Sequence, residues 1–134
     1  MSIEKEAREF KEKTGIELPV SLVELYKEKG NGGFGPDCGM LGIITGHKTD
    51  LDDSILSLYQ SFCSGDPDDP NWVWPKELVP FIHVGCAIHY CIDSTSSASS
   101  VIEFDPTDYA SEVGPKDHFR EVCPSFMEWV ASNV

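Results

Sequence analysis

Two histidines and two cysteines form the densest group of metal-ligating side chains in this sequence: His83, Cys86, His89 and Cys91. On one continuous strand, His83 and His89 would lie about 20 Å apart at about 3.3 Å per residue, which is too far for one zinc ion. A tight turn at Gly85 would instead let the two histidines face each other across a hairpin. A tetrahedral site would still need further ligands, and the spacing matches no zinc motif. We therefore favour ordinary sheet residues over a metal site and expect no cofactor.

The glycine-rich stretch LYKEKGNGGFGP, residues 25–36, raises the alternative of a phosphate-binding loop. Such loops place glycines ahead of a helix N-terminus, usually with a lysine. Here the glycines follow a helical pattern and lead into MLGIIT, residues 40–45, which we expect to form a strand. We therefore predict that Gly30 ends a helix in the left-handed conformation. Residues 31–33 should form a tight turn, with Asn31 capping that turn through its own side chain.

The net charge of the chain indicates which classes of partner it can bind. Ten Lys and Arg face 23 Asp and Glu, which gives a formal net charge of −13. Nucleic acids and anionic membranes need basic contacts, so neither is an expected partner, whereas a basic protein would be attracted. The acidic stretches TDLDDS and GDPDDPN lack the ligand positions of an EF-hand, and we interpret them as helix capping and a solvated loop.

Nucleophile motifs are also missing. The sequence has no G-x-S-x-G, and its five cysteines are irregularly spaced with no C-x-x-C. The N-terminus MSIEKEAREF is charged rather than apolar, unlike a signal peptide, and no apolar run approaches the length of a membrane span. We therefore expect a cytoplasmic, non-enzymatic protein with free thiols.

Hydrophobic periodicity predicts the secondary structure. Helices are expected over 2–14, 19–29 and 51–63 and again near the C-terminus, within PSFMEWVASNV. Strands are expected at 40–45, in two segments between 77 and 93 on either side of Gly85, and at 99–105. This order, without strict β–α–β alternation, indicates a single α+β domain over 1–134 with one mainly antiparallel sheet.

A partner-binding surface is expected where acidic and aromatic residues lie together. The residues are Asp66, Asp68, Asp69, Trp72 and Trp74. Tryptophan is a frequent anchor at protein interfaces, and both tryptophans can share one face of an extended segment. The alternative, that they cover the core instead, is favoured for the tryptophans themselves.

Several sequence pieces, taken in order, resemble one known family. GIELPVSLVELYKEKGNGG at 15–33 is similar to the signature of the SUKH superfamily, the SMI/KNR-like domains: a leucine-proline pair opening a helix, an apolar-aromatic run, then Asn-Gly-Gly. The later pieces resemble the family's remaining elements: Trp74 with LVPF at 78–81, Gly85, YCID at 90–93, VIEFD at 101–105 and SFMEWV at 125–130. Before YCID, the family often has a richer Gly/Asp turn than the VGCAIH found here.

The resemblance implies a fold and a function. The fold would be one twisted, mostly antiparallel sheet with packed helices. Many bacterial members are immunity proteins that bind and neutralise toxins, often nucleases, and fungal relatives act as interaction modules in cell-wall regulation. We therefore expect an immunity protein for a cognate, basic toxin domain, with a nuclease as one candidate class. A regulatory scaffold, or a small metal-dependent hydrolase that uses the His/Cys group, remains the alternative.

Overall fold

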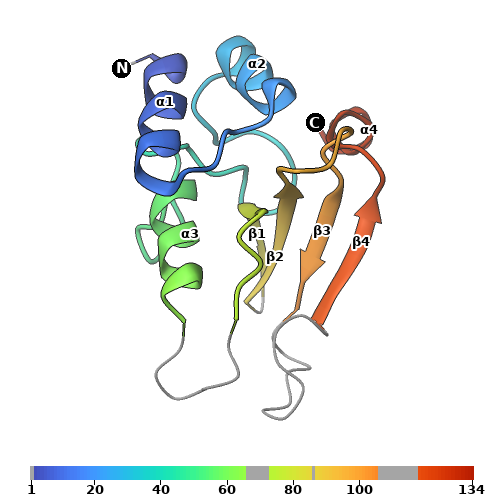
Figure 1. The fold of residues 1–134 in the computed structure, drawn as a ribbon. Helices are drawn as coiled ribbons and strands as arrows, with labels where there is room; N and C mark the ends of the chain where they lie inside the picture. Colours follow the sequence, from blue (N-terminus) through green and yellow to red (C-terminus); the bar gives the residue numbers. More distant parts are fainter. Residues whose placement is uncertain (1, 66–72, 86, 106–117) are drawn as a thin grey trace.

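The computed structural model describes residues 2–65, 73–85, 87–105 and 118–134 (Figure 1). Within them, three helices precede the sheet and one follows it: α1 (Ile3–Thr14), α2 (Val20–Lys29), α3 (Ile55–Ser64) and α4 (Phe126–Asn133). The strands are β1 (Leu78–Gly85), β2 (Ile88–Asp93), β3 (Val101–Phe104) and β4 (Phe119–Cys123). The predicted α+β fold class is confirmed.

The sheet is antiparallel throughout. Its strand order is β1-β2-β3-β4, and each strand pairs antiparallel with the next one in the chain. Figure 1 shows α3 beside β1, and α4 follows directly after β4 at the other edge of the sheet. β4 was not predicted from the sequence. Its segment, FREVC, is short and carries charged residues at positions that remain exposed, so it gives little hydrophobic signal.

Local capping explains where α1 begins and ends. The Ser2 hydroxyl accepts a hydrogen bond from the Lys5 amide at 3.1 Å, which satisfies one of the open amides of the first turn. Gly15 ends the helix in the left-handed conformation, with φ of 79°. These caps agree with the helix predicted over 2–14. Gly30 likewise ends α2, but its ψ of 177° is extended rather than left-handed helical, so that detail of the prediction was wrong.

The start of α3 also differs from the prediction. The helix begins at Ile55, not at residue 51, because Ser54 is the N-cap and forms a reciprocal capping box with Ser57. Asp52 has φ of 67°, which a right-handed helix cannot contain. The aspartates before Ser54 therefore belong to a loop that leads into α3.

The predicted strand at 40–45 was wrong. Met40 forms one isolated antiparallel bridge to Ile82, and the Leu41 amide donates to the Phe81 carbonyl at 2.9 Å. Beyond this point the chain leaves β1, although Leu41 and Ile43 remain buried. The apolar run therefore reports burial in the core rather than membership of the sheet.

Candidate functional site

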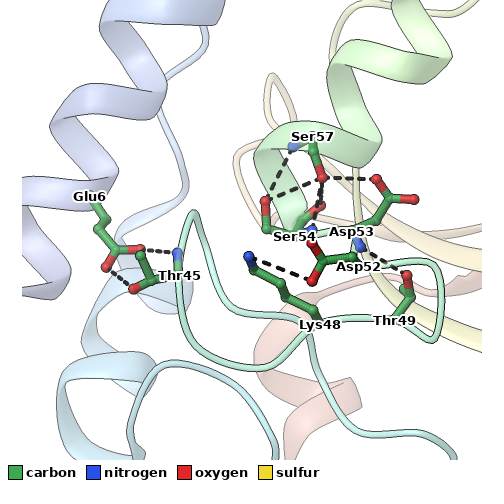
Figure 2. A network of polar contacts seen from close by, with 8 residues as sticks. All are labelled: Glu6, Thr45, Lys48, Thr49, Asp52, Asp53, Ser54 and Ser57. Atoms are coloured by element: carbon green, nitrogen blue, oxygen red, sulfur yellow. Dashed lines mark hydrogen bonds and ion pairs between the residues drawn. The ribbon is translucent and has the colours of Figure 1, made fainter.

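A buried carboxylate holds the long loop between α2 and α3. Glu6, on α1, is fully buried. Its Oε1 accepts hydrogen bonds from the Ile44 amide at 2.8 Å and the Thr45 amide at 2.9 Å. Its Oε2 accepts from the Thr45 hydroxyl at 2.6 Å, and the Asn31 side-chain amide lies 3.1 Å from both oxygens. Figure 2 shows Glu6 reaching from the helix to Thr45. The charge of the buried Glu6 carboxylate is thus satisfied by hydrogen-bond donors from two segments distant in sequence, at Asn31 and at residues 44–45.

These hydrogen bonds also decide the protonation state of Glu6. Burial alone would raise the pKa of this carboxyl group. The hydrogen bonds from Thr45, Asn31 and Ile44 act in the opposite direction and outweigh burial, so the pKa lies below its ordinary value. Glu6 therefore remains a carboxylate. We call this carboxylate and its donors, Asn31, Ile44 and Thr45, the Glu6 junction, because they join α1 to the loop between α2 and α3.

Asn31 links the turn after α2 to the same junction. Its side-chain Oδ1 accepts from the Ile43 amide at 2.9 Å, and its backbone carbonyl accepts from the His47 amide at 3.1 Å. The predicted structural role of this turn is confirmed, but the predicted self-capping by Asn31 was wrong, because its side chain bonds to Ile43 and Glu6 instead. At Gly32, where φ is 82°, an added Cβ would lie 2.5 Å from the Met40 carbonyl oxygen. The loop therefore requires glycine there.

The loop entering α3 has an equally fixed backbone. The Thr49 amide donates to the Asp53 carbonyl at 3.0 Å, and the Asp52 amide donates to the Thr49 carbonyl at 2.9 Å. The Asp53 carboxylate accepts from the Ser57 hydroxyl at 2.9 Å, and the Asp53 amide donates to the Thr49 hydroxyl at 3.0 Å. Figure 2 shows the Ser57 and Thr49 side chains in contact with Asp53 at the start of α3. Thr49 and Asp53 thus close a short loop.

Leu51 lies at the tip of this closed loop. Its side chain is 86% exposed, the highest value among the exposed large hydrophobic residues in the described part of the chain. Asp50 and Asp52 lie on either side of it and are exposed. Lys48 pairs with Asp52 at 3.8 Å and lies at the edge of the loop. We define residues 49–53 as the Leu51 loop: an exposed aliphatic side chain flanked in sequence by two exposed aspartates, on a backbone held by hydrogen bonds.

A family model decides the identity of the domain. The model of the SMI1 / KNR4 family (SUKH-1) matches residues 4–132. The chain belongs to the SUKH-1 family. No curated protein and no solved structure matches this SUKH-1 domain. The family is generally associated with non-enzymatic immunity proteins. None of the helices in the described part of the chain combines the length and the apolar character needed to cross a membrane.

The predicted partner-binding residues divide into two groups. Asp66, Asp68, Asp69 and Trp72 lie outside the described residues of the SUKH-1 domain, so their role remains a prediction. Trp74 is described and is only 5% exposed, with its ring against Phe62 and Phe104 and its indole N–H donating to the Leu78 carbonyl at 2.9 Å. Trp74 is therefore a core residue, as favoured for it from the sequence, and its inclusion among the partner-binding residues is corrected.

The two histidines of the His/Cys group do face each other. His83 and His89 are cross-strand partners at the β1–β2 hairpin, with ring centroids 4.8 Å apart. Gly85, with φ of 105°, lies at the end of β1. His89 is buried, and its Nδ1 lies 3.0 Å from the Ala87 carbonyl oxygen. Burial, together with the neighbouring His83, lowers the pKa of His89 to about 4, so this ring is neutral at pH 7.

The cysteines do not complete a metal site with this pair. Cys91 is fully buried and Cys86 lies outside the described residues. Burial raises the pKa of the Cys91 thiol, which makes it a poor metal ligand. Among residues 2–65, 73–85, 87–105 and 118–134, no three His, Cys, Asp or Glu side chains lie close enough together to hold a metal ion. The described part of the hairpin therefore supports the interpretation of these histidines as sheet residues.

Proposed function

We propose that this SUKH-1 domain is a cytoplasmic immunity protein that binds and neutralises a cognate toxin domain with a basic surface, such as a nuclease. The observation that carries this proposal is the Leu51 loop. It presents one aliphatic side chain, 86% exposed, between acidic groups. The family association with immunity proteins and the net charge of −13 support the same reading.

The rigidity of the loop matters for affinity. Ordering a flexible loop on binding costs free energy, so a loop already held in one conformation binds more tightly for the same contacts. Three hydrogen bonds of 2.9–3.0 Å fix the backbone of the Leu51 loop: two join Thr49 to Asp53, and one joins Asp52 to Thr49. Leu51 would become buried in the complex and provide affinity. The neighbouring aspartates would accelerate encounter with a basic partner.

The test is a pull-down with the tagged protein from the native organism at low and moderate salt. A basic toxin domain is expected among the captured proteins and is then made as a catalytically inactive variant for binding measurements. Wild-type protein should bind it, and affinity should fall as salt concentration rises, because exposed charges are screened. Absence of binding, or capture of a protein that is not a toxin, would contradict the immunity role and favour the regulatory scaffold. Binding independent of ionic strength would remove the charge-complementarity argument.

Two point variants locate the surface. Leu51→Ser should weaken toxin binding by about tenfold or more, as expected for an interface anchor, without changing the melting midpoint. Val73→Ser removes an exposed side chain next to the predicted stretch 66–72. If Val73→Ser lost toxin binding and Leu51→Ser did not, the binding surface would lie near residues 66–72, and the assignment to the Leu51 loop would be wrong. Val122→Ser, on β4, is the matched control.

A further inference from the structure

A hollow of about 540 Å³ opens where three separate segments meet, and we call it the α2–α4 hollow. They are the start of α2, the serine-rich connection 94–100 between β2 and β3, and the start of α4. Figure 1 shows these segments together beside the C-terminal helix. The size lies within the range of ligand pockets, roughly 300–1,000 Å³. Neither the Leu51 loop nor the Glu6 junction contributes to it.

Backbone donors from both helices remain open at this hollow. α2 begins after Pro19, which supplies no side-chain cap, so the Val20 and Ser21 amides have no acceptor in the described structure. At the start of α4, the Phe126 amide donates to the Ala98 carbonyl, whereas the Met127 amide has no acceptor among the described residues. Val20, Ser21 and Met127 all line the hollow. Two positive helix ends therefore border one space.

Ser99 adds an independent observation. Its side chain lines the hollow, the residue is only 9% exposed, and its hydroxyl makes no hydrogen bond within the described structure. The neighbouring Ser96 and Ser100 hydroxyls, in contrast, are bonded to each other at 3.2 Å. Ser99 is one of the residues that line the hollow, and its hydroxyl is not among the enclosed side-chain atoms that lack a partner in the described structure, so it reaches the protein surface. A surface-reaching hydroxyl without a protein partner can donate a hydrogen bond to a group bound in the hollow.

The lining also indicates which chemical group would fit. Val20 and Met127 are 75% and 54% exposed and give the hollow an aliphatic rim. Among the described residues no lysine or arginine lines it, and the one charged lining residue among them, Glu17, pairs with Lys11 at 3.3 Å. A doubly charged phosphate would be disfavoured beside Glu17 without a cation. A singly charged carboxylate suits neutral amide and hydroxyl donors at helix N-termini better.

We propose that this hollow binds a carboxylate that carries a neighbouring aliphatic group, as the C-terminal residue of a peptide does. The carboxylate oxygens accept hydrogen bonds from the open amides at Val20, Ser21 and Met127 and from the Ser99 hydroxyl. The aliphatic group packs on the rim formed by Val20 and Met127. This site is independent of the proposed toxin interaction and of the Leu51 loop.

The experiment titrates ¹⁵N-labelled protein with N-acetyl-leucine and follows the amide resonances by NMR. Saturable shifts are expected at Val20, Ser21, Ser99 and Met127. N-acetyl-leucinamide lacks the carboxylate and should give no saturable shift, and N-acetylglycine lacks the aliphatic group and should bind more weakly. Equal binding of the amide, or inorganic phosphate binding more tightly than N-acetyl-leucine, would overturn the proposal. Absence of saturable shifts at the hollow would do the same.

A variant separates this site from unspecific association. Ser99→Gly removes the hydroxyl at a position whose φ of 56° glycine adopts readily, so the variant should fold. Its dissociation constant for N-acetyl-leucine should rise about tenfold, the usual effect of losing one hydrogen bond to a charged group. Ser64→Ala, outside the hollow, is the matched control and should bind as wild type does. Unchanged affinity in Ser99→Gly would contradict the assigned role of the hydroxyl.

Discussion

The Glu6 junction and the α2–α4 hollow collect polar groups in opposite ways. At the junction, one buried carboxylate accepts hydrogen bonds from Ile44, Thr45 and Asn31. At the hollow, donors from three segments converge, yet the Ser99 hydroxyl and the Val20, Ser21 and Met127 amides have no acceptor in the described structure. The first region is complete within the chain, whereas the second lacks an acceptor.

This difference separates polar groups that serve the fold from polar groups that can serve a ligand. Hydrogen bonds satisfied internally stabilise the native state and leave nothing to offer a ligand. Donors that converge without an acceptor contribute little to folding and are available for binding. The two regions should therefore respond differently to mutation, and the expected changes in stability decrease from the first region to the second.

The largest effect is expected at the junction. Glu6→Ala would leave the Ile44 and Thr45 amides and the Asn31 side chain buried without their acceptor, and should lower the free energy of unfolding by about 4 kcal/mol. Urea denaturation measures this change. Glu12→Ala, an exposed glutamate on the same helix, is the control and should stay within about 0.5 kcal/mol of wild type. Similar values for both variants would show that the junction is not a major source of stability.

A second effect should come from the turn that carries Asn31. Gly32→Ala should cost about 3 kcal/mol, because a positive φ and a Cβ overlapping the Met40 carbonyl act together. Gly15→Ala is the matched control: its φ of 79° is similar, but no atom lies within 4 Å of the added Cβ. That variant should cost only about 1 kcal/mol. Equal losses in thermal stability would mean that backbone overlap at Gly32 contributes nothing.

His89 is a third buried polar group, and its effect depends on pH. Its pKa is about 4 in the folded protein and 6.5 in the unfolded chain, mainly because burial disfavours the charged ring. The unfolded chain therefore takes up a proton first, and stability should fall as pH decreases from about 6.5 toward 4, by up to about 3 kcal/mol. The urea midpoint between pH 7 and pH 5 tests this. His89→Gln should flatten the dependence, and an unchanged slope would assign it to another group.

The smallest stability effect is expected at the hollow. Ser99→Gly should change the free energy of unfolding by no more than about 0.5 kcal/mol, because the hydroxyl has no partner to lose and its φ of 56° favours glycine. Differential scanning calorimetry is sufficient to measure it. A loss comparable to that of Glu6→Ala would erase the contrast between the two regions and indicate that Ser99 is structural.

Local patterns predicted a large part of the fold. Ser2 and Gly15 mark the ends of α1 because capping depends on neighbouring residues alone. The hairpin around Gly85 and the strand at β3 followed from apolar alternation. The apolar run at 40–45 was assigned wrongly because periodicity reports burial and cannot tell which backbone groups will satisfy its amides. The Ile43 amide bonds to Asn31, and the Ile44 and Thr45 amides bond to Glu6, instead of to a neighbouring strand.

The candidate sites were much harder to predict. Glu6 is one of several glutamates on a helix with an ordinary amphipathic pattern, and its acceptor role appears only when residues 31–45 fold back onto it. The α2–α4 hollow needs three segments that are distant in sequence. The prominent proline at position 19 was correctly placed at the start of a helix, but the consequence, open amides without a cap, needs the surrounding space to be known.

The Glu6 junction also limits the order in which the chain can fold. Glu6 lies 38 and 39 residues before its amide donors at Ile44 and Thr45. During synthesis, α1 leaves the ribosome long before those donors exist, so its inner face carries a charge that has no partner. The helix can therefore dock only after the loop through Thr45 has emerged, and fragments that end earlier should keep α1 in water.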